Sequence, residues 1–355
     1  MMEKYGNGNT KIRYFREKNL SCQVMARSIN ETKVLITRDI PAIGIDLLRE
    51  QGFQVTVMGY DKPLTAAELK EAAKKHNALL CLSADKINAA FLTECKHLEV
   101  ISQFAVGYDN IDLEEATKLR IPVGNTPDVL SDATADVAFG LMMVVSRKMF
   151  YLHKSIAKGE WKYFQPKKDL GIELKNKTLG IFGLGRIGIE MAKRCKGAYN
   201  MNVIYHNRNR NTKAEEQLNA KWVSFDDLLQ QSDVLSVHSV FSPETKGIFN
   251  KTTFGKMKKN AIFINTSRGG VHNEEDLTEA LNSGTIWGAG LDVTNPEPML
   301  PDNPLLSMPN VAVLPHIGSG TVEARNAMSR LAAENIIEFY KNNRVPNILN
   351  REVLT

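Results

Sequence analysis

A short apolar run followed directly by three spaced glycines constrains the fold of this chain more than any other feature. Residues 178–182 have the length and composition of a buried strand. Gly183, Gly185 and Gly188 come next at G-x-G-x-x-G spacing, and apolar residues then recur at helical spacing. Because the motif stands between a strand and a helix, it indicates a dinucleotide-binding turn more strongly than a glycine-rich turn with only a structural role.

The three glycines have different roles in a turn of this kind. Gly183 permits the tight turn, Gly185 lets the backbone approach a pyrophosphate, and Gly188 lets the helix pack closely on the strand. The pyrophosphate would lie on free N–H groups where the helix begins, near Arg186 and Ile187, because the positive end of the helix dipole favours an anion.

Short apolar runs and helical patterns alternate along the chain, and this alternation predicts parallel sheets with helices on both faces. A Thr65–Glu68 capping box marks the start of one helix. Before the glycine turn we expect helices at residues 43–51 and 65–76 and strands at 34–37, 53–57, 78–82 and 99–102. After it we expect strands near residues 202–206, 233–237, 261–264, 286–291 and 311–314.

Two further expected helices connect the two series of strands. Residues 132–158 favour one long helix, apolar nearly all round, which should run between domains or at a subunit interface. An amphipathic helix at about 321–340 should return to the first domain. The sequence therefore predicts an α/β fold of two Rossmann-like doubly wound parallel-sheet domains, the cofactor domain inserted into the flavodoxin-like substrate domain. The expected parts are a flexible N-terminal extension (1–30), a substrate-binding domain (31–131 plus 323–350) and a dinucleotide-binding domain (132–322).

Composition and charge exclude several classes of protein. Of 355 residues, 43% are hydrophobic and 24% are charged, as in soluble globular proteins. The net charge of +5 is spread along the chain, which argues against nucleic-acid binding. The longest apolar run, residues 137–145, is too short to span a membrane, and no signal peptide is evident. The four cysteines form no C-x-x-C pair, so we expect reduced thiols, no bound metal and a cytoplasmic location.

Polar side chains that could carry out chemistry follow three strands of the second series. Arg268, Asp292 and His316 each lie just past an expected strand, and Glu297 follows Asp292 by five residues. Taken singly, each has an ordinary explanation as a surface ion pair, a turn cap, a structural histidine or a solvated carboxylate. In open parallel sheets, however, ligands bind at the carboxyl ends of the strands, so these side chains should converge on one cleft.

These residue types suit the reduction of a 2-keto acid by hydride transfer. A proton must reach the carbonyl oxygen as hydride reaches the carbon, and His316 suits this role because the pKa of histidine lies near neutral pH. Glu297 would fix the imidazole ring and favour its charged form. Arg268 offers a planar charged fork to the substrate, in hydrogen bonds worth about 1.5–3 kcal/mol.

The chain resembles the D-isomer-specific 2-hydroxyacid dehydrogenase family from about residue 34 to 347. Residues 123–130 and 159–161 are similar to the glyoxylate/hydroxypyruvate reductase branch. The motifs that carry the family resemblance are Gly-Leu-Gly-Arg-Ile-Gly (183–188), Asn-Thr-Ser-Arg-Gly-Gly (265–270), Gly-Ala-Gly-Leu-Asp-Val (288–293), Pro-Glu-Pro (296–298) and Leu-Pro-His-Ile-Gly-Ser (314–319).

The resemblance implies roles for individual residues. Arg268 would bind the substrate, His316 would act as acid/base, and Glu297 would be its partner. It also implies a homodimer with the helix near 132–158 at the interface. The substrate carboxylate would be anchored by the backbones of Ser83, Ala84, Val106 and Gly107. The predicted cofactor-binding residues are Gly183, Gly185, Arg186, Ile187, Gly188, Asn207, Arg208, Arg210, Asp292, Gly318 and Ser319, with Asp292 near the nicotinamide.

Two positions depart from the family pattern. Asp136 stands where members often have Glu, and we attach little weight to this difference. Phe164 stands where the reductase branch has a Trp that reaches toward the partner's active site, so the preferred substrate size is open.

The basic loop after the second strand of the cofactor domain predicts NADPH as the cofactor, with NADH weaker. NAD-specific domains usually place an acidic residue there to bind the ribose 2′-hydroxyl, and this chain has none. A carboxylate would repel a 2′-phosphate, whereas Arg208 and Arg210 can bind it. The alternative is an exposed basic loop that is indifferent to the phosphate.

The favoured function is NAD(P)H-dependent reduction of small 2-keto acids, such as glyoxylate and hydroxypyruvate, to D-2-hydroxy acids. A 2-ketogluconate reductase is the nearest alternative, because it needs only a roomier pocket. A phosphoglycerate dehydrogenase is disfavoured because the chain stops at Thr355 without a regulatory domain, and a formate dehydrogenase because Glu297 stands where that enzyme has Gln. A non-catalytic, cofactor-sensing binding protein is disfavoured because the chain lacks long tails or linkers beyond the core.

Overall fold

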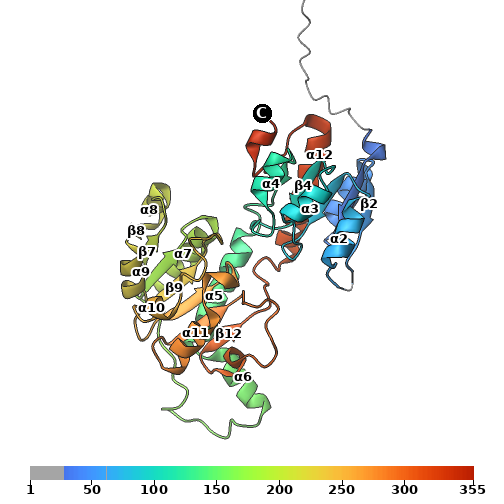
Figure 1. The fold of residues 1–355 in the computed structure, drawn as a ribbon. Helices are drawn as coiled ribbons and strands as arrows, with labels where there is room; N and C mark the ends of the chain where they lie inside the picture. The colour runs from blue at the N-terminus through green and yellow to red at the C-terminus, as the bar shows by residue number, and fades with distance from the viewer. Residues whose placement is uncertain (1–27, 61) are drawn as a thin grey trace, which may run out of the picture.

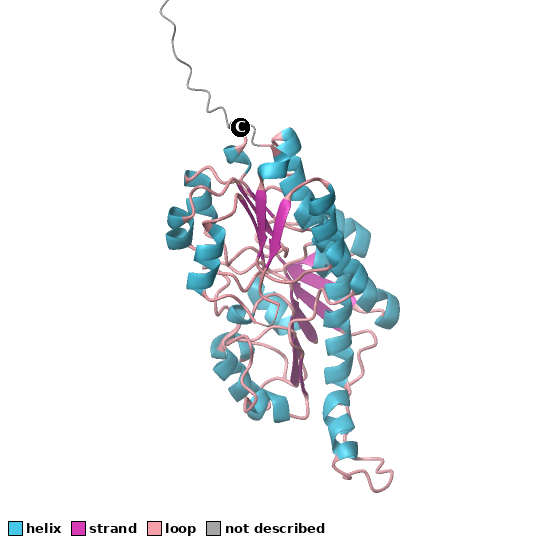
Figure 2. Ribbon diagram, turned by 90° about the vertical axis from the view of Figure 1, so that its right-hand side faces the viewer, coloured by secondary structure: helices cyan, strands magenta, loops and turns pink. Residues whose placement is uncertain are grey.

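Two parallel sheets divide the chain into two α/β domains, which confirms the predicted fold class (Figure 1; Figure 2). The computed structural model describes residues 28–60 and 62–355, so most of the predicted N-terminal extension lies outside the described residues. Both the blue start and the red end of the chain belong to the first domain, and the middle of the chain forms the second (Figure 1). The second domain is therefore inserted into the first, and the boundaries given above stay a prediction.

The first sheet consists of β1 (Lys33–Ile36), β2 (Gln54–Val57), β3 (Ala78–Cys81), β4 (Val100–Gln103) and β5 (Val123–Gly124). Its strand order is β2-β1-β3-β4-β5, and all neighbouring strands run parallel. This is the flavodoxin-like order, in which the direction of winding reverses between β1 and β3. Every residue of β3 and β4 is buried, because helices cover both faces of the sheet.

The helices of the first domain are α1 (Ala42–Glu50), α2 (Ala66–Ala73), α3 (Ala89–Glu94), α4 (Leu113–Lys118) and α12 (Val322–Asn342). The predicted capping box is confirmed at α2, where the side chains of Thr65 and Glu68 each accept a hydrogen bond from the other residue's backbone N–H. α12 comes from the far end of the chain and packs on α1, where the Ser329 hydroxyl accepts a hydrogen bond from the Gly44 N–H (3.1 Å). Its apolar face completes the core of this domain.

The second sheet consists of β6 (Thr178–Phe182), β7 (Asn202–His206), β8 (Lys221–Trp222), β9 (Val234–Val237), β10 (Ile262–Asn265), β11 (Gly288–Leu291) and β12 (Val311–Val313). Its order is β12-β11-β10-β9-β6-β7-β8, all parallel, with the winding reversal between β6 and β9. Its helices are α7 (Arg186–Tyr199), α8 (Thr212–Leu218), α9 (Phe225–Gln231), α10 (Lys251–Phe254) and α11 (Glu274–Asn282). Two buried apolar clusters pack this domain.

The expectation of one helix over residues 132–158 is wrong. The structure has two helices there, α5 (Ser131–Ser146) and α6 (Met149–Ala157). Lys148 adopts a left-handed conformation (φ 55°), which ends an α-helix, and the Ile172 N–H bonds the carbonyl of Ser146 (2.9 Å) at the end of α5. α5 still connects the two domains, because Ala133 packs in the first core and Val145 in the second.

The cysteines that the structure describes, Cys81, Cys95 and Cys195, are free and buried. Burial raises the pKa of the Cys195 thiol to about 12, so this thiol stays protonated and unreactive. Among residues 28–60 and 62–355, no helix is both long and apolar enough to cross a membrane.

Candidate active site

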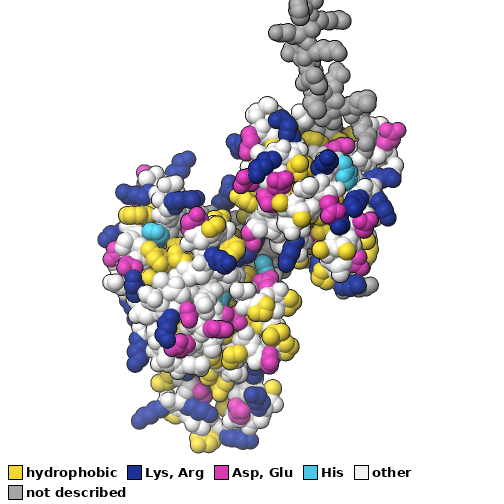
Figure 3. All heavy atoms as spheres, viewed as in Figure 1, with side chains coloured by type: hydrophobic (Ala, Val, Ile, Leu, Met, Phe, Trp, Pro, Cys, Tyr) yellow, Lys and Arg dark blue, Asp and Glu magenta, His cyan; other side chains and the backbone are white. Residues whose placement is uncertain are grey.

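A cleft of about 690 Å³ lies between the two domains, and Figure 3 shows the hollow between the two lobes. Loops that follow strands of both sheets line it: Arg268 follows β10, Asp292 follows β11 and His316 follows β12. The structure brings together in this one cleft every residue that the sequence analysis assigned to catalysis and to the substrate. These residues are Ser83, Ala84, Val106, Gly107, Arg268, Glu297 and His316.

His316 and Glu297 form a short hydrogen bond, with 2.5 Å between His316 Nδ1 and Glu297 Oε1. Their side chains are 38% and 42% exposed, so a ligand in the cleft can reach the ring. Burial acts to raise the pKa of Glu297, but the hydrogen bond and charge of His316 outweigh it and lower that pKa. A charged Glu297 accepts from Nδ1–H, which leaves Nε2 as the nitrogen that can transfer a proton.

Asp292 holds the loop that carries His316. Its buried carboxylate accepts hydrogen bonds from the N–H groups of Ile317 (2.8 Å) and Gly318 (2.7 Å). Burial raises the pKa of Asp292, although these N–H groups and His316 act in the opposite direction. His316 itself has a left-handed backbone (φ 53°), which costs about 1–2 kcal/mol in a non-glycine residue. The Asp292 hydrogen bonds therefore stabilise a conformation that the loop would not otherwise favour.

Arg268 joins the two domains. Its Nε lies 3.0 Å from Oδ1 of Asp109 in the loop after β4, and its Nη1 donates to the Ser267 carbonyl (2.9 Å). Nη2 lies against Gly107, where a Cβ would come within 1.9 Å of it. A side chain at 107 would displace the guanidinium from this place, so residues of both domains contribute to the position of Arg268 in the cleft.

The loop that carries Arg268 is supported by two buried residues. Asn265 Nδ2 donates to the Arg268 carbonyl (2.9 Å), and Asn265 Oδ1 accepts from the Ser267 N–H (2.9 Å). His272 Nδ1 lies 3.0 Å from the same Nδ2. Burial lowers the pKa of His272 to about 4, so its ring is neutral and Nδ1 can accept this hydrogen bond.

The glycine turn has the geometry that a dinucleotide requires. Gly183 has φ 99°, and a Cβ there would lie 2.7 Å from the Ser239 nitrogen. A Cβ on Gly188 would lie 2.8 Å from the Gly183 carbonyl, whereas nothing lies within 4 Å of a Cβ on Gly185. Gly185 is also the N-cap residue that precedes α7, and it provides no side-chain cap. Open space at an uncapped helix N-terminus fits a bound pyrophosphate.

Of the three residues of the basic loop after β7 that were predicted to bind the cofactor, two already have side-chain partners within the protein. Arg210 is paired with Glu215 through two contacts (3.0 and 2.5 Å), and the Arg210 guanidinium lowers the pKa of Glu215 to about 2. The Asn207 side chain accepts a hydrogen bond from the Leu184 N–H (2.6 Å) inside the glycine turn. Arg208 is exposed and forms no ion pair within the described part of the chain. Of the two arginines in this loop, Arg208 is therefore the one that is not held in an ion pair with a described residue and is available to bind a phosphate.

Several other polar residues that line the cleft were not predicted from the sequence, and Arg38, Asp109 and His238 are among them. These three lie in the loops after β1, β4 and β9, so the strand-end rule that selected Arg268 and His316 would have selected them too. Burial lowers the pKa of His238 to about 4, so its ring is neutral. In the described residues, no group of three or more His, Cys, Asp or Glu side chains could hold a metal ion.

Known proteins resemble this chain over most of its length. A family profile for the NAD binding domain of D-isomer specific 2-hydroxyacid dehydrogenases matches residues 139–318. The glyoxylate reductase of Thermococcus litoralis is 44% identical over 327 residues, which are 91% of this chain and 98% of that protein. The glyoxylate reductase of Pyrococcus horikoshii is 41% identical over 91% of this chain and 97% of that protein.

Two solved structures have a similar fold. A glyoxylate reductase from Paecilomyes thermophila has a TM-score of 0.81 at 31% identity, covering 90% of this chain and 99% of that one. An NADPH-dependent glyoxylate/hydroxypyruvate reductase from Sinorhizobium meliloti, in complex with NADP and malonate, has a TM-score of 0.79 at 29% identity, covering 90% and 97%.

Substitutions at Gly183 and Gly185 should separate stability from dinucleotide binding. Gly183→Ala introduces a side chain at positive φ and against backbone, so we expect it to lower the free energy of unfolding by about 1–3 kcal/mol. Gly185→Ala meets no protein atom, so the melting temperature should not change, while the methyl group should weaken dinucleotide binding about tenfold or more. Thermal unfolding and a fluorescence titration with NADPH measure the two effects. Wild-type affinity in Gly185→Ala would contradict this assignment.

Proposed function

Because this chain belongs to the D-isomer-specific 2-hydroxyacid dehydrogenase family, we propose that it reduces small 2-keto acids, such as glyoxylate and hydroxypyruvate, to D-2-hydroxy acids, with NADPH as the preferred reductant. The observation that carries the proposal is the His316–Glu297 pair in one interdomain cleft with Arg268. The glyoxylate reductases that resemble this chain over nine-tenths of its length support the same class of substrate.

Arg268 would bind the substrate. A guanidinium has five N–H donors, and in this structure Nε is used by Asp109 and one Nη1 donor by Ser267. The remaining donors can form charge-assisted hydrogen bonds with the substrate carboxylate and with the carbonyl oxygen. The backbone N–H groups of residues 83–84 and 106–107 would hold the other side of the carboxylate. The carbonyl group would then be oriented before the reaction begins.

His316 would supply the proton. Its Nδ1 is held by Glu297, so Nε2 can donate to the carbonyl oxygen as that oxygen gains negative charge, and can take the proton back in the reverse direction. Asp292 is a positioning residue, because its bonds to the Ile317 and Gly318 N–H groups fix the loop on which the ring stands. A bound reduced nicotinamide supplies the hydride that the carbonyl carbon accepts.

The dinucleotide would lie along the carboxyl end of the second sheet. Because no acidic residue follows β7 and Arg208 is free, we assign the 2′-phosphate of NADPH to Arg208. Arg210 would contribute less, because Glu215 already neutralises it. The residues that would hold the cofactor are Gly183, Gly185, Arg186, Ile187 and Gly188 at the pyrophosphate, Asn207, Arg208 and Arg210 at the ribose phosphate, and Asp292, Gly318 and Ser319 at the nicotinamide end.

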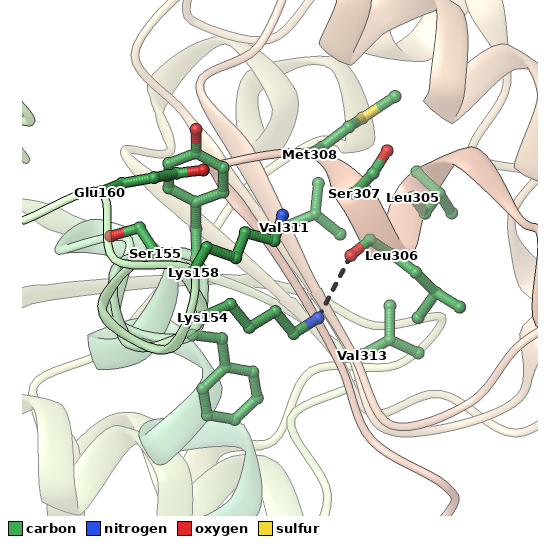
Figure 4. Close-up of a pocket in the computed structure, with 12 residues that line it drawn as sticks. Lys154, Ser155, Lys158, Glu160, Leu305, Leu306, Ser307, Met308, Val311 and Val313 are labelled. Atoms are coloured by element: carbon green, nitrogen blue, oxygen red, sulfur yellow. Dashed lines mark hydrogen bonds between the residues drawn. The ribbon is translucent and has the colours of Figure 1, made fainter.

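We also propose that two copies associate through α6 and the loop after it. Several large apolar side chains are exposed there, and clusters of this kind mark interaction sites. Beside them is a pocket of about 240 Å³, in which the Lys154 ammonium donates to the Leu306 carbonyl (3.4 Å) (Figure 4). A side chain of the second copy could fill it. The exposed side chains are Met149, Phe150, Ile156, Trp161, Tyr163 and Phe164.

The catalytic assignment is tested by the rate at which NADPH is oxidised in the presence of glyoxylate. His316→Gln should lower kcat by roughly 10²–10⁴-fold, because the proton donor is lost. Glu297→Gln should cost less, because the ring remains. The matched control is His97→Gln, an exposed histidine in the first domain. No turnover of glyoxylate, hydroxypyruvate or 2-ketogluconate by the wild-type protein would instead favour a non-catalytic, cofactor-sensing protein.

The cofactor assignment is tested by kinetics with NADPH and NADH. Wild-type kcat/KM should be higher with NADPH than with NADH. Arg208→Gln should reduce kcat/KM about tenfold or more with NADPH, as expected for the loss of one charge-assisted contact. The same substitution should change kcat/KM little with NADH. Arg210→Gln serves as the comparison and should have the smaller effect. A wild-type preference for NADH, or equal losses with both cofactors, would refute the assignment.

The association of two copies is tested by sedimentation of the wild-type protein, which should have twice the mass of one chain. A double substitution, Phe150→Asp with Ile156→Asp, would place charges on the proposed interface and should yield monomers. Tyr60→Asp changes an exposed aromatic residue in the first domain and should leave the mass unchanged. A monomeric wild-type protein would rule this interface out.

A further inference from the structure

Arg38 lies at the winding reversal of the first sheet. It follows β1 by two residues, while Ser83 and Ala84 follow β3, and the strand order β2-β1-β3 places the reversal between these two strands. In doubly wound sheets the crevice outside this point is where ligands bind. Arg38 also lines the cleft that contains Arg268 and His316. Arg38 therefore lies where residues of doubly wound sheets contact bound ligands.

Two of the three guanidinium nitrogens of Arg38 lack hydrogen-bond partners in the described part of the chain. Its Nε and Nη2 are buried and have no hydrogen-bond partner among the residues that the structure describes. The buried carboxylate of Asp85 is close in the fold, but its Oδ2 accepts from the Thr37 hydroxyl (2.5 Å) and the Leu82 N–H (2.8 Å) and not from Arg38. Unsatisfied buried donors cost free energy, so an oxygen-bearing ligand that reaches Arg38 would be bound favourably.

The order of the strands separates Arg38 from the groups that would hold the substrate carboxylate. Arg268 contacts Gly107 and Asp109 after β4, whereas Arg38 follows β1, and β3 lies between these strands. Two strand spacings amount to about 10 Å. The long arginine side chain and the ligand would cover this span together. Arg38 is thus placed to meet the opposite end of a molecule whose carboxylate is bound by Arg268.

We propose that Arg38 is a specificity-determining residue that binds an oxygen-bearing, preferably anionic, group on C3 of the 2-keto acid. This proposal rests on the proposed function, because it takes the carboxylate at Arg268 as given. Glyoxylate has no C3, hydroxypyruvate carries a hydroxyl there, and oxaloacetate carries a carboxylate. A guanidinium binds a carboxylate through two parallel hydrogen bonds and a hydroxyl through one. The contribution of Arg38 therefore increases in that order.

The test is kcat/KM for glyoxylate, hydroxypyruvate and oxaloacetate in the wild-type protein and in Arg38→Gln and Arg38→Lys. Arg38→Gln should lose about tenfold with hydroxypyruvate and about a hundredfold with oxaloacetate, mainly through KM, against about two- to threefold with glyoxylate. Arg38→Lys keeps the charge but not the fork, so its losses should be intermediate. Arg49→Gln, an exposed arginine on α1, is the matched control and should behave as wild type.

Other results would overturn either the role of Arg38 or the proposed function on which it rests. Equal losses with all three substrates would overturn the proposal, because Arg38 would then act on the shared carboxylate or on folding. So would a wild-type protein that reduces glyoxylate but neither of the larger substrates. If Arg38→Gln fails to fold, the same comparison is made with Arg38→Lys. If the wild-type protein reduces none of the three, the proposed function fails. Calorimetric binding of malonate to wild type and to the Arg38 variants then decides the role of Arg38, which an unchanged affinity would overturn.

Discussion

Parallel strands place all of their carboxyl ends at one edge of a sheet, and in this protein the loops from two such edges line one cleft. Most of the other features of the site depend on this constraint. Arg268 and Asp109 are 159 positions apart in sequence, yet they meet because each follows a strand of its own sheet. The strands are buried and rigid, while the loops are free to carry polar groups. Buried strands that end in polar loops can hold residues from distant parts of the chain in one site.

Much of this arrangement could be predicted because the signals were local or followed a general rule. The glycine spacing after residues 178–182 is local, and in the structure Gly183 has a positive φ, Gly185 faces open space and Gly188 packs against the backbone of the turn. Arg268 and His316 were found by a rule about strand ends, which needs only the strands to be recognised. Buried strands such as β3 and β10 are recognisable because all of their residues are apolar or nearly so.

Other features could not be predicted because their cause lies elsewhere in the chain. The break between α5 and α6 occurs at Lys148, and neither Gly nor Pro marks it, so the helical pattern of the sequence continues through it. Arg210 looks free in the sequence, but Glu215 in the next helix pairs with it. The strands β5 and β8 have two residues each, which is too short for an alternating pattern to show.

The position of α12 has a consequence for how the chain acquires its structure. Residues such as Met328, Ala332 and Ile336 fill the core of the first domain, yet they leave the ribosome after the whole second domain has been made. During translation all strands of the second domain are synthesised before α12, so the second domain can fold first. Until α12 is made, the strands of the first domain have an uncovered apolar face. The lobe that begins the chain is therefore the last to be finished, and a nascent chain stalled before residue 322 would be the species most prone to aggregate.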